Sequence, residues 1–445
     1  MVLFYSERRS SRLDYICNQI LGRVIGYEYR MTDNENELQS FDGPSICYAK
    51  DYKGKGLHIV PCGLLFEETL TPQQLEVSEW QSMPIFYRTE GTDIPFDIFA
   101  ASFYLITRYE EYLDADPDKH GRFKAENSLA YQNGFLERPL VDEWALALRS
   151  VMQSKYGAEP ENAPSFRFEP TIDVDHAFAF RHKGPIVNGK KILEAVLDKD
   201  FKRVGNILKV LFRLKRDPFF NFEKLCEIHA PFGRDAHLFF HCGGRGKYDK
   251  RTFFPSWRYF LAKRKSDRFI TAGLHPSYRA ASTPWLFRLE RNVMACAVKH
   301  SVDSCRFHYL KCTFPDSYDM LAQAGFKDDW SMIYSNDPGF RASTSFPFYF
   351  YNLKKEKAYA LLIHPTAVMD KTLHSNKGMS VDEAYDYIMA LAQKVEAVNG
   401  HFVTLFHNDH LTDAFEEWRG WETLYRRIIN HFPVETSHRG VLPSP

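Results

Sequence analysis

The sequence lacks several features that would place the protein in a specialised class. Its 445 residues contain no uninterrupted apolar run of the ~18 residues that a membrane-spanning helix needs. Charged residues follow the first few apolar ones directly, and no small-residue cleavage site comes after them, so no secretory signal is visible. The eight cysteines form no CxxC pair, which disfavours a structural zinc site. We therefore expect a cytoplasmic protein without a transmembrane segment.

The chain also lacks an excess of charge of either sign. Lys plus Arg and Asp plus Glu each number 57, so the formal net charge is zero. Without a global positive field, the protein has no long-range attraction to nucleic acid or to an anionic membrane. Because no transmembrane segment is expected, any contact with a membrane would be peripheral. A hydrophobic content of 44% nevertheless supplies enough apolar surface for a stable fold. We expect a neutral or locally recognised ligand; the oligomeric state is not indicated.

A chain of this length is too long for one compact core, so we expect two domains. Residues 157–164 are rich in Pro, Gly and polar side chains, as linkers are, and we place the boundary there. An α+β domain is expected over residues 1–157 and a second domain over residues 165–445. The elements expected in the first part are strands at 46–48 and 57–60 and helices at 97–113 and 141–155.

The second part alternates short apolar strands with longer amphipathic segments such as 381–398. The strand candidates are 166–174, 237–240, 269–274, 304–308, 358–363 and 401–406. Repeated strand and helix in that order predicts a parallel sheet, either open or closed into a barrel. In such folds the active site gathers at the carboxyl ends of the strands.

Two carboxylates follow the first of these strands. Asp173 and Asp175 are two residues apart, so an extended chain points both to the same side. Carboxylates that close repel each other unless a cation or a shared proton relieves them, which indicates a metal site or an acid–base role. The alternative is a structural role for both, in helix caps or salt bridges.

Imidazoles and a guanidinium follow other strands. His275 comes directly after the strand at 269–274, and a neutral imidazole is a common ligand of divalent ions. The strand at 401–406 ends in His407-Asn408-Asp409-His410, where one of the two histidines suits a general acid whose tautomer a neighbouring carboxylate fixes. Each of these histidines alone is also compatible with an ordinary buried side chain. Because Arg306 and His308 end a further strand, the recurrence predicts a metal hydrolase site built from several loops.

The chain resembles the polysaccharide deacetylases, the NodB-like carbohydrate esterases, over residues 166–432. The residues that carry the resemblance, in chain order, are Thr171-Ile172-Asp173-Val174-Asp175, His275, Arg306, Asp328-Asp329-Trp330 and His407. The resemblance implies an α/β fold, a distorted (β/α) barrel. The part before it looks like a module that precedes such domains in bacterial envelope-polysaccharide clusters.

The resemblance also implies a role for each matching residue. Asp173 would be the general base, with Arg306 orienting it, and His407 would protonate the departing amine. Asp175 and His275 would bind a divalent metal ion, with zinc the expected one. The candidates for substrate binding are Tyr278, Trp330 and Arg341.

One position departs from the family pattern. The family has a second histidine four residues after the first, where this chain has Arg279. One Asp and one His are few ligands for catalytic zinc, which generally has three protein ligands. His241, His176 and Asp249 are the candidates for completing the set. Otherwise metal binding is weaker, another ion is used, or the fold is kept without the activity.

The expected function is removal of an N-acetyl group from an amino sugar of a cell-envelope polysaccharide or its precursor, such as an activated nucleotide- or lipid-linked sugar. An alternative is an inactive protein of the same fold that binds glycan or acts in polysaccharide assembly. A third reading, a glycosidase, needs two carboxylates that flank the sugar. Asp173 and Asp175 are too close along one strand for that arrangement.

Overall fold

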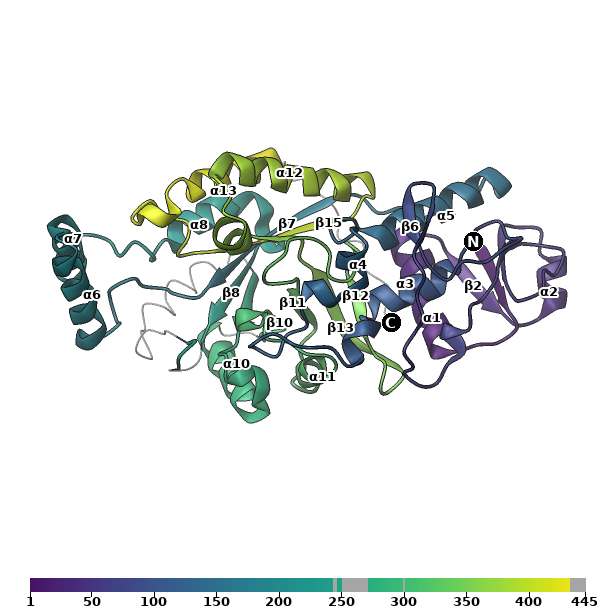
Figure 1. Ribbon diagram of the computed structural model, residues 1–445, viewed down its shortest axis with the longest axis horizontal. Coiled ribbons are helices and arrows are strands. Elements are labelled where there is room, and N and C mark those ends of the chain that lie inside the picture. Colours follow the sequence, from purple (N-terminus) through teal and green to yellow (C-terminus); the bar gives the residue numbers. More distant parts are fainter. Residues whose placement is uncertain (243–245, 250–270, 299–300, 433–445) are drawn as a thin grey trace.

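A computed structural model of the protein describes residues 1–242, 246–249, 271–298 and 301–432. Its two main sheets lie side by side along the long axis of the molecule (Figure 1). Residues 1–157, called the N-terminal module from here on, form the smaller sheet. The predicted range 165–445 includes segments outside the described residues. No described helix combines the length and apolar character that crossing a membrane requires.

The N-terminal module is built on a four-stranded parallel sheet with strand order β2-β1-β3-β4. Its strands are β1 Val2–Ser6, β2 Tyr29–Thr32, β3 Ser45–Tyr48, β4 Leu57–Ile59 and the hairpin β5 Ser78–Trp80 and β6 Met83–Ile85. Its α-helices are α1 Ser11–Cys17, α2 Glu35–Ser40, α3 Ile98–Ile106, α4 Leu129–Gln132 and α5 Leu140–Tyr156. The strands predicted at 46–48 and 57–60 and the helix predicted at 141–155 are therefore confirmed.

The prediction of a helix over 97–113 is wrong for its second half. It ends at Ile106, Arg108 takes a left-handed conformation with φ of 56°, and a 3-10 turn follows. The buried guanidinium of Arg108 lies 2.7 Å from Glu110 Oε1 and 2.8 Å from Glu111 Oε1. On a continuous helix, side chains two residues apart do not face each other, so the break lets one cation bind both carboxylates.

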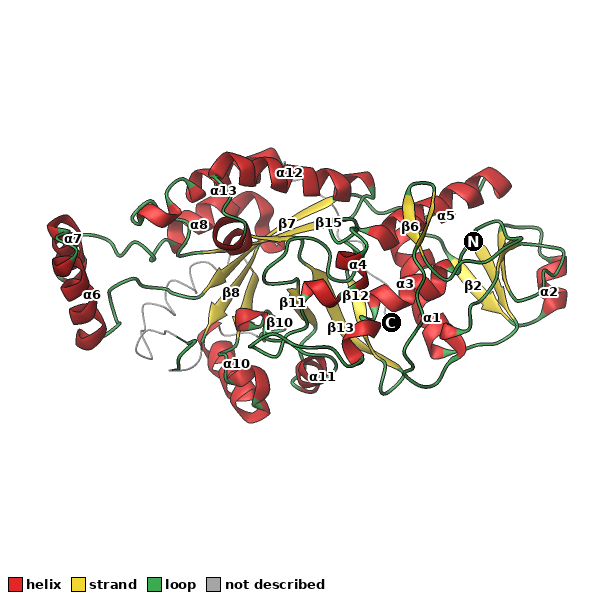
Figure 2. Ribbon diagram, in the orientation of Figure 1, coloured by secondary structure: helices red, strands yellow, loops and turns green. Residues whose placement is uncertain are grey.

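The second part forms a curled nine-stranded sheet with helices packed outside it (Figure 2). The strand order is β12-β13-β11-β10-β9-β8-β7-β15-β14, and every neighbouring pair is parallel except β12 with β13. The strands are β7 Arg167–Val174, β8 His237–His241, β9 Thr271–His275, β10 Ser304–Cys305, β11 Asp328–Met332, β12 Phe348–Asn352, β13 Lys357–Pro365, β14 Val368–Met369 and β15 His401–His407. The α-helices are α6 Pro185–Leu197, α7 Phe201–Leu211, α8 Phe222–His229, α10 Pro284–Val298, α11 Asp316–Gln323, α12 Val381–Ala397 and α13 Trp421–His431.

The α/β class and the parallel sheet are confirmed, but closure into a barrel is not seen. The edge strands β12 and β14 do not pair with each other among the described residues. All six predicted strands are present, although residues 269–270 of one lie outside the described residues and β10 has only two residues. Strand β11 was not expected, because three of the five residues in its sequence Asp-Asp-Trp-Ser-Met are polar and the pattern of a buried strand is apolar.

Apolar packing is continuous from the N-terminal module into the larger sheet. Polar contacts reinforce this interface. The carboxylate of Asp142 on α5 accepts hydrogen bonds from the backbone N and the Oγ of Ser345, each at 2.7 Å. Because Asp142 and Ser345 are both buried, these bonds fix the loop before β12 against the module. The module and the sheet therefore pack as one unit.

Candidate metal and acid–base site

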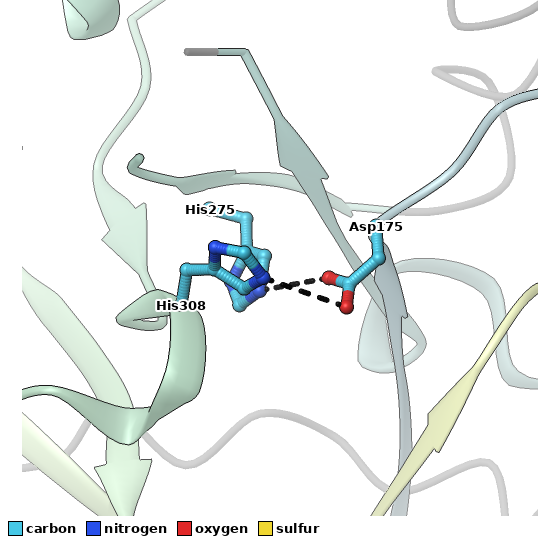
Figure 3. A group of neighbouring side chains, drawn as sticks. All are labelled: Asp175, His275 and His308. Atoms are coloured by element: carbon cyan, nitrogen blue, oxygen red, sulfur yellow. Dashed lines mark ion pairs between the residues drawn. The ribbon is translucent and has the colours of Figure 1, made fainter. Parts of the chain in front are cut away.

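Three side chains from separate strand ends converge at the carboxyl edge of the sheet. Asp175 follows β7, His275 ends β9, and His308 follows β10. Nε2 of His275 lies 3.1 Å from Asp175 Oδ1, and Nε2 of His308 lies 3.6 Å from Asp175 Oδ2. Figure 3 shows both imidazoles presenting a nitrogen to the carboxylate. The three ligand atoms lie within 4.8 Å of one another, so one ion can reach all of them.

The outer nitrogen of each imidazole is fixed by another group. Nδ1 of His275 donates to the backbone carbonyl of Arg306 at 2.7 Å. Nδ1 of His308 lies 3.2 Å from Oδ1 of Asp249. A hydrogen on Nδ1 leaves the lone pair on Nε2, and both Nε2 atoms face Asp175. This is the arrangement that orients metal-binding histidines in proteins.

The charges around these residues fit a divalent cation. Oδ1 of Asp175 is buried and has no hydrogen-bond partner in the described part of the chain. Burial alone would lower the pKa of His308, but Asp175 and Asp249 outweigh it and raise the pKa to about 9. The negative potential that holds a proton on this imidazole would equally favour a metal ion in its place.

His308 is the residue that the sequence interpretation did not propose as a third ligand. Of the three candidates named there, His176 lies beside Lys183, with Nδ1 3.5 Å from Nζ, and is not in the group. His241 and Asp249 form a neighbouring group that shares His308. Arg279, at the position of the family's second histidine, is exposed. The sequence did carry one signal for His308 as a ligand: it lies two residues after Arg306, at a strand end.

Asp173 lies next to this group and is held by Arg306. Nη1 of the buried Arg306 lies 3.1 Å from Asp173 Oδ1, and the other oxygen, Oδ2, lies 3.8 Å from Nε2 of His275. Arg306 is fixed in turn, because its Nε donates to the carbonyl of Trp330 at 2.8 Å and its Nη1 donates to Oγ1 of Thr171 at 2.7 Å. The guanidinium therefore sets the orientation of the Asp173 carboxylate.

His407 lies on the other side of Asp173, its register partner across the parallel strands β7 and β15. Its Nδ1 lies 2.8 Å from Oδ1 of Asp370, a fully buried carboxylate that sequence analysis missed. Burial would lower the pKa of His407, but Asp370 outweighs it and raises the pKa to about 10. Nδ1 of His410 lies 2.8 Å from the other oxygen of Asp370. These three could also hold an ion, but each imidazole already binds the carboxylate at hydrogen-bond distance, which favours a charged pair.

Aromatic side chains form a wall beside His308. The ring of Tyr278 lies 4.4 Å from that of Tyr248 and 5.7 Å from that of Tyr309, measured between centroids. His120 of the N-terminal module joins them, with Nδ1 3.0 Å from the hydroxyl of Tyr278. We call His120, Tyr248, Tyr278 and Tyr309 the aromatic wall. Its presence means that the N-terminal module contributes directly to the surroundings of the site.

The two other predicted substrate-binding residues lie away from this wall. The indole of Trp330 is buried and stacks on the ring of His364, with centroids 3.9 Å apart. It also contacts His237, the first residue of β8, so it lies toward the amino end of the sheet. Arg341 is buried and donates from Nε to Oε1 of Glu111 at 2.9 Å, so its guanidinium joins the module to the sheet.

Comparison with known proteins gives partial matches. A family of unknown function, DUF7033, matches residues 2–157. No curated protein matches the sequence. One similar solved structure is a candidate polysaccharide deacetylase from Mycobacterium smegmatis, with a TM-score of 0.39, 12% identity, and coverage of 62% of this chain and 86% of that chain.

Two further solved structures are similar at the same level. A candidate polysaccharide deacetylase of O-antigen biosynthesis from Bordetella bronchiseptica has a TM-score of 0.31 and 14% identity, covering 63% of this chain and 88% of its own. A 4-alpha-glucanotransferase from Thermococcus litoralis has a TM-score of 0.37 and 9% identity, covering 61% of this chain and 38% of its own. At these scores the likenesses assign no activity to the chain.

Proposed function

We propose that the protein is a metal-dependent hydrolase that removes the N-acetyl group from an amino sugar of a cell-envelope polysaccharide or its precursor. One observation carries the proposal: the Nε2 atoms of His275 and His308 converge on the carboxylate of Asp175. A carboxylate, Asp173, and a charged imidazole, His407, adjoin this group. Amide hydrolysis needs such a proton acceptor and such a proton donor beside an electrophilic centre.

The ion would be held by Asp175, His275 and His308. Two imidazoles and one carboxylate are a donor set that catalytic zinc sites use, so we propose zinc. When bound, the ion would polarise the acetamide carbonyl and lower the pKa of the attacking water. The fixed Nδ1 atoms of the two histidines keep their Nε2 atoms available as ligands without rearrangement.

Asp173 is the proposed general base. Its Oδ2 faces the same space as Nε2 of His275, 3.8 Å away, so it adjoins the ion site without being needed as a ligand. The proton of the attacking water would pass to this carboxylate. Arg306 is a positioning residue, because it binds Asp173 Oδ1 and is itself held by the backbone of β11. A fixed carboxylate costs less reorganisation when the proton moves.

His407 is the proposed general acid. Expulsion of an amide nitrogen as an anion is unfavourable, so the leaving amine must receive a proton. The carboxylate of Asp370 keeps the imidazole charged, with a pKa of about 10, and fixes Nδ1 so that Nε2 is the proton donor. Acetate and the free amino sugar are the products.

The aromatic wall suits a sugar ring. The half-buried rings of Tyr248, Tyr278 and Tyr309 cluster beside His308, and sugars pack on aromatic rings while their hydroxyls form hydrogen bonds. His120 binds the hydroxyl of Tyr278 and would fix this wall from the N-terminal module. An N-acetylated glycan or an activated sugar is therefore the proposed substrate.

The proposal is tested by measuring bound metal and released acetate together. We expect about one zinc ion per chain, and acetate release from N-acetylglucosamine oligosaccharides or from UDP-N-acetylglucosamine. Removal of the metal with a chelator should abolish acetate release, and added zinc should restore it. Acetate release that survives chelation, or shortening of the oligosaccharide instead of deacetylation, would overturn the proposal.

A further inference from the structure

A pair of helices projects from the sheet at the end of the molecule opposite the N-terminal module (Figure 1). Helices α6 and α7 pack against each other and are inserted between β7 and α8. The insertion begins ten residues after Asp175, so it leaves the sheet at the same edge as the candidate site. We call residues 185–216, which include α6, α7 and the turn that follows them, the projecting hairpin.

The projecting hairpin exposes most of the large apolar side chains found on the surface. Of the fourteen exposed large hydrophobic residues in the described ranges, nine lie on it. On α6, Ile186, Leu193 and Leu197 are spaced i, i+7 and i+11, which places them on one stripe of the helix. Ile186 is 87% exposed. A soluble protein rarely leaves such a patch uncovered unless it binds something there.

Helix α7 repeats the same spacing. Phe201, Leu208 and Phe212 are again i, i+7 and i+11, and all three are exposed, Phe201 by 70% and Phe212 by 73%. The opposite face is buried, because Ile207 and Val210 pack with Ala179 and Phe180 at the base of the hairpin. Helix α7 therefore has two apolar faces, one buried at the base of the hairpin and one exposed.

The charge of the hairpin indicates which partner covers it. Residues 185–216 contain nine Lys and Arg against three Asp and Glu, although the whole chain is balanced at 57 of each. A basic segment with exposed apolar stripes matches a surface that is anionic outside and apolar below it. Pairing with the hairpin of a second copy would bring two positive surfaces together, which electrostatic repulsion opposes.

The two segments that connect the hairpin to the rest of the fold are bonded to each other at its base. The buried carboxylate of Asp217 accepts hydrogen bonds from the backbone N atoms of Ala179, Phe180 and Arg181, at 2.7, 3.0 and 2.9 Å. The side-chain amide of Asn188 on α6 donates to the carbonyl of Phe180 at 2.8 Å. The hairpin is thus closed at its base by buried hydrogen bonds.

We propose that the projecting hairpin docks the protein on a membrane surface that contains anionic lipids. The apolar stripes enter the boundary between head groups and acyl chains, and the lysines and arginines bind lipid phosphates. Docking of this kind is peripheral and needs no membrane-spanning helix. If the proposed function holds as well, the site lies beside the membrane, where a lipid-linked sugar is presented. Docking itself does not depend on that function.

The test is sedimentation of the full-length protein with vesicles of phosphatidylcholine alone or mixed with phosphatidylglycerol. We expect binding to the mixed vesicles that weakens with added salt, and little binding to phosphatidylcholine alone. The double variant Phe201→Ser/Phe212→Ser should lower the partition coefficient roughly tenfold or more. Trp285→Ser/Leu289→Ser is the matched control, because both side chains are exposed on α10 instead of the hairpin, and it should bind as the wild type does.

A charge reversal distinguishes binding to anionic lipids from nonspecific hydrophobic adsorption. Lys202→Glu/Lys209→Glu changes two exposed basic residues of α7 and should weaken binding to the mixed vesicles roughly fivefold or more for each residue. Thermal unfolding of each variant checks that the fold is kept. Absence of wild-type binding to the mixed vesicles would overturn the proposal. So would a wild-type dimer, seen by light scattering, that Phe201→Ser/Phe212→Ser converts to a monomer.

Discussion

The carboxylate of Asp249 lies 3.2 Å from Nδ1 of His308 and orients the opposite nitrogen, Nε2, toward Asp175, 3.6 Å away. Asp249 also accepts a hydrogen bond from the backbone N of Tyr278 at 2.8 Å. One carboxylate therefore fixes both a proposed ligand and the start of the aromatic wall. Since an imidazole with its outer nitrogen bound to a carboxylate is a stronger metal ligand, Asp249 should strengthen metal binding without touching the ion.

Replacement of Asp249 tests this relationship. Asp249→Asn should weaken zinc binding by roughly 10- to 100-fold, the usual cost of removing an outer partner of a metal-bound histidine. Competition with a zinc-binding dye measures the affinity directly, without an activity assay. Asp316→Asn, on the exposed first turn of α11, is the control and should bind zinc as the wild type does. An unchanged affinity in Asp249→Asn would mean that His308 is not a ligand.

Replacement of Asp173 should separate metal binding from turnover. Asp173→Asn keeps the size of the side chain but cannot accept the proton of the attacking water, so kcat should fall by roughly 10²- to 10⁴-fold. Zinc content should stay near that of the wild type, because Asp173 is not one of the three proposed ligands. His308→Ala, by contrast, should lose both. Turnover that is unaltered in Asp173→Asn would remove this residue from the mechanism.

The pH dependence of turnover reports on His407. A general acid must be protonated, and the pKa of His407 is about 10, so activity should persist to high pH and fall as the pH rises through that value. Asp370→Asn removes the carboxylate that outweighs burial, so the pKa should drop. The alkaline limb of kcat should then move to lower pH by more than about one unit.

A control for this shift is available in the same cluster. His410 also binds Asp370, but its ring stacks on Trp418 with centroids 3.4 Å apart. Because His410 binds the other oxygen of Asp370, its loss leaves the bond between Asp370 and His407 in place. His410→Gln should therefore leave the alkaline limb within about half a unit of the wild type. Equal shifts in His410→Gln and Asp370→Asn would indicate that the limb follows the whole cluster and would contradict the role given to His407.

The contribution of the N-terminal module to substrate binding is tested at His120. Its ring contacts the aromatic wall, and its Nδ1 binds the hydroxyl of Tyr278. His120→Ala should raise KM roughly five- to tenfold, since the hydrogen bond to Tyr278 and the ring contacts with Tyr248, Tyr278 and Tyr309 are lost, while kcat changes little. Zinc affinity should not change. A fall in kcat at constant KM would place His120 in the chemical step instead of the binding wall.

Much of the site could be predicted because strand ends mark it in the sequence. Asp173, His275 and His407 each close a short apolar strand, and parallel strands bring such ends to one edge. Alternation along β7 placed Asp173 and Asp175 on one side, and both carboxylates indeed approach Nε2 of His275. The α/β class followed from the same pattern of strands and helices.

The remainder depended on contacts between residues distant in sequence. His308 lies beyond a strand of two residues, too short for its direction to be inferred from alternation. Asp370 follows another two-residue strand, β14, whose pairing with β15 only the folded chain shows. Arg341 was among the residues expected to bind substrate. Nothing in the local sequence indicates that Glu111, 230 residues earlier, neutralises it.

The buried pair of Arg341 and Glu111 should therefore affect stability more than substrate binding. Both side chains are at most 3% exposed, and Glu111 also binds Arg108. Arg341→Met leaves a buried carboxylate with one cation fewer, so we expect the free energy of unfolding to fall by about 3 to 5 kcal/mol. Urea unfolding measures this loss. Because an uncompensated charge causes most of it, the double variant Arg341→Met/Glu111→Leu should recover part of the stability. If Arg341→Met instead raises KM while unfolding is unchanged, Arg341 binds substrate after all.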